Sequence, residues 1–538
     1  MRRGLVILLA VAGCADDSKK RDQNDTPNRN DNLAFVVGPT LEHNGPAAPM
    51  ARVLRLQTNR PTQVEVTWTL DGEAPTQVQF SDFAETHTLP VVGFKADKTY
   101  DLVVTVTDDD GGQLTADDLT VRVAPLPDWF PTVEVLASEP GVAPGMTLAC
   151  LRPGNNGPYS DLEYLMVIDS DGDVIWYYEG SPIITDVRQL PSGNLLGIEG
   201  ETATEWNVLG GKENVWIGEM TEPEGGEIVV AGLKHHLHHD LVPFGESTMF
   251  SLTIDEVVVP DYPSNYTNVN ATSEATIAGE SIVEFDRDGT LIETWSLTDL
   301  LDRHRIGFDS LGPRAEWTDW GHANTIVYDQ SDDTLIASLR HQDAVVKLSR
   351  ATGELIWILG NHDNWGPDLQ PYLLTPRGAP FEWQYHQHAP MLGGGGKILM
   401  MDNGNARTSP FLGEDPMAES ESYSRVVEFE VDEDSMEIQQ NWEYRDSTTG
   451  GLYSPAMGDA DYLENGNVLA IFGSVSHESG VALGESGAGT HSIRIVEFKP
   501  GTPNETVFEL RLTSPKDDNR SGWTGNRVQR ITSLYPSL

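Results

Sequence analysis

The sequence of 538 residues predicts an all-β protein, in which a six-bladed β-propeller is preceded by an N-terminal immunoglobulin- or fibronectin-like β-sandwich. Three observations lead to this prediction. Short runs of alternating apolar and polar residues, separated by turn residues, fill most of the chain. A β-run followed by a turn and a tryptophan recurs through the part after residue 125. Helical periodicity is rare, and residues 298–305 form the one short helix that we expect.

The first residues have the pattern of an export signal. Two arginines precede a short apolar run, and the small residues Ala12 and Gly13 lead to Cys14. Such a run is too short to span a membrane in the mature protein. Its ending resembles a bacterial lipoprotein box, and an ordinary secretory leader is the alternative. We expect a signal peptide over residues 1–13, lipidation at Cys14 and a disordered polar tether over residues 14–34. The protein would then be extracytoplasmic and would meet the membrane only through this lipid anchor.

Residues 35–125 are expected to form the β-sandwich. Alternating runs return about every ten residues, which is typical of the short strands of a small sandwich. Trp68 on a middle run and Tyr100 at the start of a late run are placed as in immunoglobulin-like modules. Three prolines between residues 125 and 131 then mark a domain boundary.

Residues 126–538 carry the repeat that predicts the propeller. The six copies lie at residues 166–176, 206–216, 282–295, 345–357, 426–442 and 495–498. Hairpins with Gly-Asn or Asn-Gly turns lie between some of the copies. Two hairpins per repeat make a four-stranded blade, and six blades close a ring. A large sandwich or a β-helix is the alternative. Because the tryptophans recur in phase, we predict that they belong to the core and not to a binding site.

The composition restricts the partners of the protein. Asp and Glu number 83 against 35 Lys and Arg, which gives a formal net charge of −48. This charge argues against nucleic-acid binding, because a phosphate backbone requires clustered cations. The chain has two cysteines, Cys14 and Cys150. If Cys14 is acylated, no disulfide can form within the chain, and a cysteine-based zinc site is excluded.

Histidines gather in one stretch of the predicted propeller. Ten of the 14 lie between residues 235 and 388, and His239, His322 and His388 each precede a strand at the same phase of the repeat. Equivalent positions on successive blades converge on the central channel, so we expect these side chains to meet. Arg340 lies 18 residues after His322, beyond a hairpin that returns the chain to its start. It is therefore expected at the same place.

Other interpretations of the histidines stay open. If residues 235–239 are extended, His236 and His238 share one face and could bind a metal ion. The same stretch could be an exposed loop without chemistry. His386, two residues before His388, is expected on the same strand face as His388, and its role is open. Loop or packing positions are expected for His341, His362, His477 and His491.

Five segments of this region together resemble the bacterial aryl-sulfate sulfotransferases, which take the sulfuryl group from an aryl sulfate and not from a nucleotide. The segments are Gly-His-Ala-Asn at 321–324, Leu-Ile-Ala-Ser-Leu-Arg-His-Gln at 335–342, Gly-Glu-Leu-Ile-Trp-Ile-Leu-Gly at 353–360, Gln-His-Ala-Pro at 387–390 and Asp-Asn-Gly-Asn at 402–405. The resemblance covers most of residues 131–510. It implies a six-bladed propeller behind an N-terminal sandwich.

The resemblance also implies roles for individual residues. His388 is similar to the family's nucleophile, which is transiently sulfated. The family's sulfuryl-binding positions are matched by His322, Asn324 and Arg340. His239 matches the remaining active-site histidine, with the neighbouring His238 as the alternative.

The implied activity moves a sulfuryl group from a small-molecule aryl sulfate to a phenolic acceptor. It follows a ping-pong mechanism through a sulfohistidine, with no cofactor and no metal. The residue types suit this chemistry. A neutral imidazole is a good nucleophile near pH 7, Arg340 offers a fixed fork of donors, and His322 or His239 can protonate the departing phenolate. Two alternatives stay open: a metal-dependent hydrolase or lyase on the same fold, and a non-catalytic propeller that binds surface polymers.

Overall fold

The computed structural model describes residues 32–154, 162–180, 183–223, 225–245, 247–446, 451–483, 490–515 and 522–536. The expected signal peptide, Cys14 and most of the expected tether lie outside these residues. At the start of the described chain, the side chain of Asn59 donates to Asn32 O at 3.0 Å and accepts from Ala34 N at 2.9 Å. Within the described ranges, no helix has both the length and the apolar character that crossing a membrane requires.

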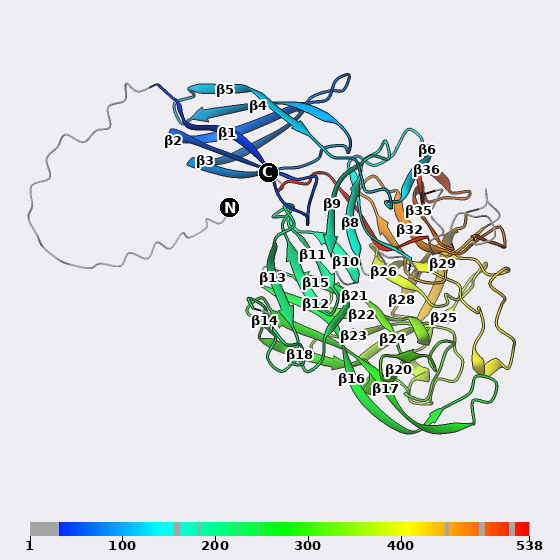
Figure 1. The fold of residues 1–538 in the computed structure, drawn as a ribbon. Helices are drawn as coiled ribbons and strands as arrows, with labels where there is room; N and C mark the ends of the chain where they lie inside the picture. Colours follow the sequence, from blue (N-terminus) through cyan, green and yellow to red (C-terminus); the bar gives the residue numbers. More distant parts are fainter. Residues whose placement is uncertain are drawn as a thin grey trace, which may run out of the picture.

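The N-terminal domain is a β-sandwich-like unit built around one long strand (blue in Figure 1). Its strands are β1 (Phe35–His43), β2 (Arg52–Thr69), β3 (Thr76–Val91), β4 (Thr99–Asp108) and β5 (Gln113–Arg122). The first half of β2 pairs with β1 and its second half with β4, while β3 pairs along both halves. The Phe94 ring lies between Trp68 and Tyr100, with centroids 5.5 and 5.0 Å away. These aromatic rings form the centre of the domain core.

Six further sheets in the described residues each contain four antiparallel strands. Three of them, from the innermost strand outward, are β37 (Trp523–Ile531), β7 (Met146–Pro153), β8 (Glu163–Ile168), β9 (Val174–Gly180); β10 (Ile184–Gln189), β11 (Leu195–Glu199), β12 (Thr202–Trp206), β13 (Lys212–Ile217); and β15 (Leu237–Phe244), β16 (Thr248–Pro263), β17 (Thr272–Asp286), β18 (Leu291–Ser296). The other three are β21 (Ala323–Asp329), β22 (Thr334–Leu339), β23 (Ala344–Ser349), β24 (Leu355–Gly360); β26 (His388–Leu392), β27 (Lys397–Asp402), β28 (Arg425–Asp432), β29 (Glu437–Tyr444); and β31 (Asp459–Tyr462), β32 (Val468–Val475), β35 (Ser492–Lys499), β36 (Glu505–Thr513). The predicted repeats therefore fall on the third and fourth strands of these sheets.

Short elements complete the sheets and their connections. They are β6 (Thr132–Ser138), β14 (Ile228–Val229), β19 (Pro313–Arg314), β20 (Trp317–Thr318), β25 (Thr375–Pro376), β30 (Leu452–Tyr453), β33 (His477–Glu478), β34 (Val481–Ala482), and the 3₁₀ turns η1 (Arg340–Gln342), η2 (Gln370–Tyr372) and η3 (Pro410–Leu412).

The innermost strands close into a ring. β10 contacts β15, β15 contacts β21, β21 contacts β26, β26 contacts β31, β31 contacts β37, and β37 contacts β10. Strands from both ends of the propeller domain complete the ring. The C-terminal strand β37 is the inner strand beside β7, and the N-terminal strand β6 pairs with the outer edge of β36. The colours of Figure 1 follow the chain around this ring from cyan to red. The predicted all-β fold, an immunoglobulin-like domain before a β-propeller, is confirmed.

The recurring tryptophans join neighbouring sheets. Each indole N–H of four of them donates to the hairpin turn of the next sheet. The pairs are Trp176 with Val208 O at 2.8 Å, Trp216 with Arg287 O at 2.9 Å, Trp295 with Arg350 O at 3.1 Å, and Trp357 with the Glu433 carboxylate at 2.8 Å. All four are buried. Their recurrence in phase thus reflects core packing, as the sequence predicts.

The expected helix over 298–305 is shorter than predicted. α1 spans Leu297–Leu300, and Ser296 caps it by accepting from Asp299 N at 3.1 Å. It ends at Leu301, whose backbone is extended, and the chain then leads to the buried Arg305. The Arg305 guanidinium lies among backbone and side-chain oxygens of neighbouring loops and stacks 4.1 Å from the Trp365 ring.

The two domains share contacts as well as a linker. The Tyr535 hydroxyl, near the C-terminus, accepts from Val92 N at 2.8 Å and donates to Val92 O at 3.1 Å. Lys95 of the sandwich reaches the Asp169–Asp173 turn of the propeller, with its ammonium 3.0 Å from Asp173. These contacts join the first domain to the C-terminal residues and to the first sheet of the propeller.

Candidate active site

The inner strands place the candidate histidines at one end of the central channel. His239, His322 and Ala389, next to His388, have positive φ angles of 59°, 49° and 51°. The register of β15, β21 and β26 shifts at these points. A bulge of this kind re-aims side chains at a strand end. The same local distortion on three sheets therefore turns the three imidazoles toward one volume.

The predicted residues meet there. The rings of His239 and His322 lie 5.0 Å apart. Arg340 N donates to His322 O at 3.2 Å, so the hairpin returns the chain as the sequence analysis expects. Asn324 donates from Nδ2 to Gln387 O at 2.8 Å, directly before His388.

The His388 ring is held in one tautomer. Its Nδ1 lies 2.7 Å from Asn403 Oδ1. The Asn403 amide nitrogen donates to Ser454 O and Met457 O, both at 2.8 Å, and this fixes which atom faces His388. Nδ1 of His388 must therefore carry a proton, which leaves Nε2 with a free lone pair. Burial, followed by the charge of Arg340, lowers the pKa of His388 well below 6.5.

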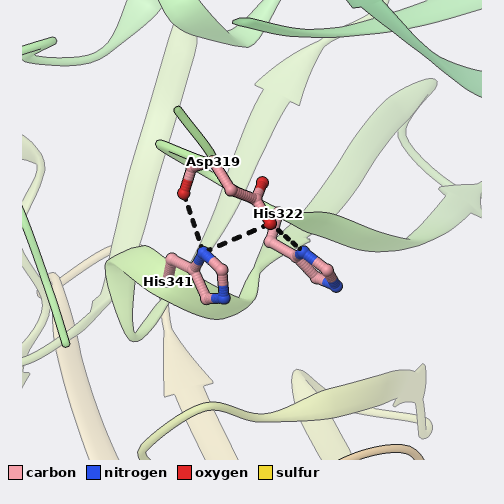
Figure 2. A group of neighbouring side chains, drawn as sticks. All are labelled: Asp319, His322 and His341. Carbon is pink, nitrogen blue, oxygen red and sulfur yellow. Dashed lines mark hydrogen bonds and ion pairs between the residues drawn. The ribbon is translucent and has the colours of Figure 1, made fainter. Parts of the chain in front are cut away.

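Asp319 orients two imidazoles (Figure 2). His322 Nδ1 is 2.6 Å from Asp319 Oδ2, and His341 Nδ1 donates to Asp319 O at 2.8 Å. The rings of His322 and His341 lie 4.6 Å apart. Burial and the nearby Arg314 lower the pKa of His322 well below 6.5. His341, expected at a loop or packing position, thus packs against an active-site histidine.

The geometry distinguishes His239 from His238. His238 Nδ1 lies 2.8 Å from His239 Nδ1, and its Nε2 lies 3.2 Å from the Glu280 carboxylate. His238 therefore stands between His239 and a buried carboxylate, while His239 faces His322. Burial lowers the pKa of both imidazoles. Of the two registers, the contact with His322 favours His239.

Arg340 is held by a carboxylate and a carbonyl. Its Nη1 lies 3.3 Å from Asp309 Oδ2, and its Nη2 donates to Pro455 O at 3.1 Å. Asp309 also faces His386, whose Nε2 lies 3.4 Å away, and the other ring nitrogen of His386 lies 3.0 Å from Asp343. Burial opposes a charge on His386, but the carboxylates of Asp343 and Asp309 together outweigh it and raise the pKa of His386. His386 thus contacts two carboxylates behind Arg340.

The prediction that His386 and His388 lie on the same face of a strand is wrong. β26 begins only at His388, and His386 has a positive φ of 54°. The left-handed residue turns the chain, so the alternation of a strand does not apply.

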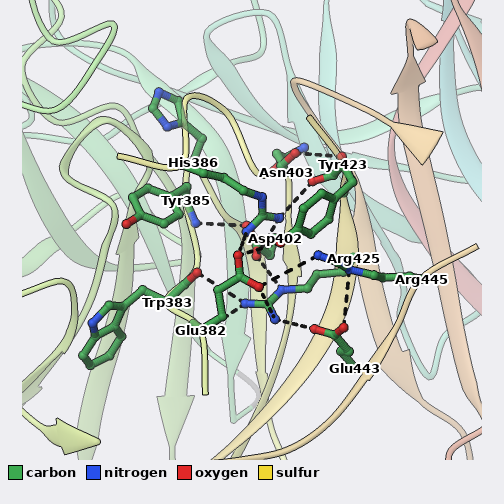
Figure 3. A network of polar contacts seen from close by, with 12 residues as sticks. Glu382, Trp383, Tyr385, His386, Asp402, Asn403, Tyr423, Arg425, Glu443 and Arg445 are labelled. Carbon is green, nitrogen blue, oxygen red and sulfur yellow. Dashed lines mark hydrogen bonds and ion pairs between the residues drawn. The ribbon is translucent and has the colours of Figure 1, made fainter. Parts of the chain in front are cut away.

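A buried ionic network anchors the loop that carries Asn403 (Figure 3). Asp402 accepts from Tyr385 N at 2.9 Å and from Arg425 Nε at 2.7 Å. Arg425 is fully buried and also contacts Glu443. This network fixes the backbone directly before His386 and directly before Asn403. The sequence segment 402–405 was part of the family resemblance, but the hydrogen bond to His388 is a finding of the structure.

The sequence analysis did not identify Arg527, which lies next to Asn324 of the candidate site. Its Nη2 donates to Asn324 O and Thr325 Oγ1, both at 3.3 Å, and it lies among the carboxylates of Asp186, Asp240 and Asp459. Arg527 belongs to the last strand, 203 residues from Asn324. No local motif could reveal that contact.

The possible metal ligands already have other partners. The His236 and His238 rings lie 6.2 Å apart, and the two face different carboxylates, Glu201 and Glu280. Asp319, His322 and His341 offer three ligand atoms within 4.8 Å of one another. However, both histidines use Nδ1 to bind Asp319, and Arg314 lies 3.4 Å from its other oxygen. This donor set fits an oriented imidazole pair better than a cation site.

A group of neutral imidazoles beside a guanidinium, at the axis of a propeller, defines a class of site suited to transferring an anionic group. Comparison with known families matches residues 137–523 to "Arylsulfotransferase (ASST)" and residues 45–124 to "Arylsulfotransferase Ig-like domain". The chain belongs to the arylsulfotransferase family. It is therefore an enzyme of the sulfotransferase kind.

Individual relatives agree with this assignment. The chain is 24% identical to "Arylsulfate sulfotransferase AssT" of Escherichia coli O6:H1 over 427 residues, 67% of each chain. It is 24% identical over 428 residues to the protein of the same name from Lelliottia amnigena, again 67% of each chain. Among solved structures, the β-propeller domain of Myceliophteria thermophila Cps50 (Swd1) is 11% identical with a TM-score of 0.32, covering 68% of this chain and 87% of that one. A TM-score this low adds nothing to the assignment.

Proposed function

We propose that the protein transfers a sulfuryl group from an aryl sulfate to a phenol by a ping-pong mechanism through sulfated His388. The family supports the reaction class. The observation that carries the mechanism is the Asn403 hydrogen bond, because it keeps Nε2 of His388 unprotonated. A buried, neutral imidazole with a fixed lone pair suits a nucleophile.

In the first half-reaction, Nε2 of His388 forms a bond to sulfur while the bond from sulfur to the aryl oxygen breaks. Arg340 and Asn324 would hold the sulfuryl oxygens, where charge must be stabilised in the transition state. The departing phenolate takes a proton from Nε2 of His322, which has to enter this step as the imidazolium; the negative charges of the bound aryl sulfate and of Asp319 favour that form. Phenol leaves, and His388 carries the sulfuryl group.

In the second half-reaction, the acceptor phenol attacks sulfur, and the bond from sulfur to Nε2 breaks. His322, neutral at this point, takes the proton of the phenol and returns it to the phenolate of the next donor. The protons therefore balance over one cycle. Asp319 supports this role, because a carboxylate 2.6 Å from Nδ1 orients the ring and stabilises its protonated form.

The test is a mass measurement on enzyme treated with 4-nitrophenyl sulfate and no acceptor. Wild-type enzyme gains about one sulfuryl group per chain, since the first half-reaction can proceed alone. His388→Ala gains none. A wild-type enzyme that releases nitrophenol without gaining mass, or a His388→Ala enzyme that is sulfated, contradicts the mechanism.

We also propose that the enzyme is extracytoplasmic and lipid-anchored at Cys14. The support is the leader pattern of the sequence, in which a short apolar run ends in Ala-Gly-Cys.

A further inference from the structure

A cavity of about 410 Å³ opens beside the candidate active site. Its lining includes the apolar side chains of Leu311 and Pro313 and the ring of Tyr266, together with His322 and His341. The Tyr266 ring lies 5.3 Å from the Phe308 ring, and its hydroxyl accepts from Leu311 N at 2.9 Å. A rigid aromatic wall beside an acid–base imidazole suits a bound aromatic ring.

Carboxylates stand around this cavity. Asp309 lines it with a half-exposed side chain, and contact with His386, assisted by Arg340, holds the pKa of Asp309 well below its usual range. Asp319, which also lines the cavity, is buried. Asp309 is therefore the ionised group that a ligand in the cavity would face.

Ionic groups also surround the cavity. Glu280 and Asp319 share Arg314, and Asp309 pairs with Arg340. On sulfated His388, the sulfuryl oxygens would carry negative charge, and the imidazole ring would carry the balancing positive charge. The acceptor would thus meet the Asp309 carboxylate and the sulfuryl oxygens together.

We propose that this cavity binds the ring of the acceptor and that it selects phenols without an anionic substituent, with Asp309 as the specificity-determining residue. The inference rests on the proposed ping-pong function, because only there does the acceptor meet a sulfated enzyme. A carboxylate on the acceptor ring would approach Asp309 and the sulfuryl group in a partly desolvated cavity. Like charges in such surroundings discriminate strongly.

The test compares two acceptors of nearly equal shape, 4-hydroxyphenylacetamide and 4-hydroxyphenylacetate, with 4-nitrophenyl sulfate as donor. We expect kcat/KM to be at least about tenfold higher for the amide, as repulsion of a like charge predicts. Asp309→Asn should reduce this ratio severalfold. Asp299→Asn removes an exposed carboxylate from helix α1, outside the cavity, and should leave the ratio as in the wild type. Equal kcat/KM values for the two acceptors, or an unchanged ratio in Asp309→Asn, would overturn the proposal.

Two further measurements keep the result interpretable. If Asp309→Asn is inactive, the ratio of kcat/KM for the amide to that for the acid is measured in wild-type enzyme at low and high ionic strength. This ratio should shrink as salt screens the exposed carboxylate. A constant ratio counts against the proposal. Tyr266→Ala should raise KM for both acceptors, and an unchanged KM would place the ring elsewhere. Failure of the proposed function looks different, since no transfer would then occur even to unsubstituted phenol.

Discussion

At the scale of single residues, the site depends on hydrogen bonds that fix protons. Asn403 assigns the tautomer of His388, and Asp319 assigns that of His322. Neither partner is itself placed to bond to sulfur in the proposed mechanism. Replacing Asn403 or Asp319 should therefore slow sulfuryl transfer without removing the nucleophile. Experiments can thus distinguish a residue that orients a histidine ring from the histidine that attacks sulfur.

Asn403→Ala should lower kcat by at least about tenfold, because a free His388 ring can place its proton on Nε2, and tautomer errors are costly in catalysis. The variant should still gain a sulfuryl group with donor alone, more slowly than wild type. Stopped-flow release of nitrophenol and the mass of the trapped enzyme measure both effects. Asn441→Ala, which removes an exposed asparagine on β29, serves as the matched control. A variant of Asn403 with wild-type kcat contradicts the tautomer argument.

Asp319→Asn should harm poor donors most. An acid catalyst contributes about 10²–10⁴-fold when the leaving phenolate is basic and much less when it is stabilised. We therefore expect a larger loss of kcat/KM with phenyl sulfate than with 4-nitrophenyl sulfate. Equal losses for both donors would show that His322 does not protonate the leaving group.

With 4-nitrophenyl sulfate, whose phenolate needs little acid assistance, the pH profile should lack an acid limb near 6.5. His388 must be neutral to attack, and burial together with Arg340 lowers its pKa well below 6.5. Activity is therefore present above that lowered pKa and is lost only as the pH falls through it. Arg340→Ala removes one cause of the lowering, so its acid limb should move to higher pH, while kcat falls roughly 10²–10³-fold. Arg303→Ala, at an exposed ion pair, should keep the wild-type profile. A limb that moves to lower pH contradicts the assignment.

At the scale of secondary-structure elements, much of the site could be predicted. The phase of the repeat placed His322 and His388 on adjacent inner strands, and the hairpin after His322 returned Arg340 to it. Local patterns could not reveal Asn403, Asp319 or Arg527 as partners, because their contacts depend on bulges and on strands far apart in sequence. The same limit explains His386, whose left-handed backbone breaks the alternation that the prediction assumed.

The indole bridges between sheets should contribute to stability. Trp216→Phe removes the partly buried hydrogen bond to the Arg287 carbonyl, and such a loss costs about 0.5–1.5 kcal/mol. Trp442→Phe is the control, because Trp442 is only partly buried and packs edge-on against Phe498. Urea denaturation followed by circular dichroism measures both variants. If the two variants lose the same free energy of unfolding, the bridge does not contribute specifically.

At the scale of the whole molecule, the chain combines a strongly acidic propeller with an expected lipid anchor. Cys14→Ser should move the enzyme from the membrane fraction to the soluble fraction with its activity intact, because the expected tether contributes no core residue. Activity toward 4-nitrophenyl sulfate in the two fractions measures this. A Cys14→Ser protein that stays with the membrane contradicts lipidation at this cysteine.

The closure of the ring by β6 and β37 also determines when the protein can fold. Arg527 N contacts Cys150 across 377 residues, so the first sheet cannot be completed until residues 523–531 are present. Contacts between residues this far apart in sequence form slowly, and unpaired strand edges stay exposed until they form. A chain that stops before residue 523 would lack the inner strand of its first sheet and, with it, the arginine beneath the active site. We therefore expect catalytic activity to depend on the presence of residues 523–531.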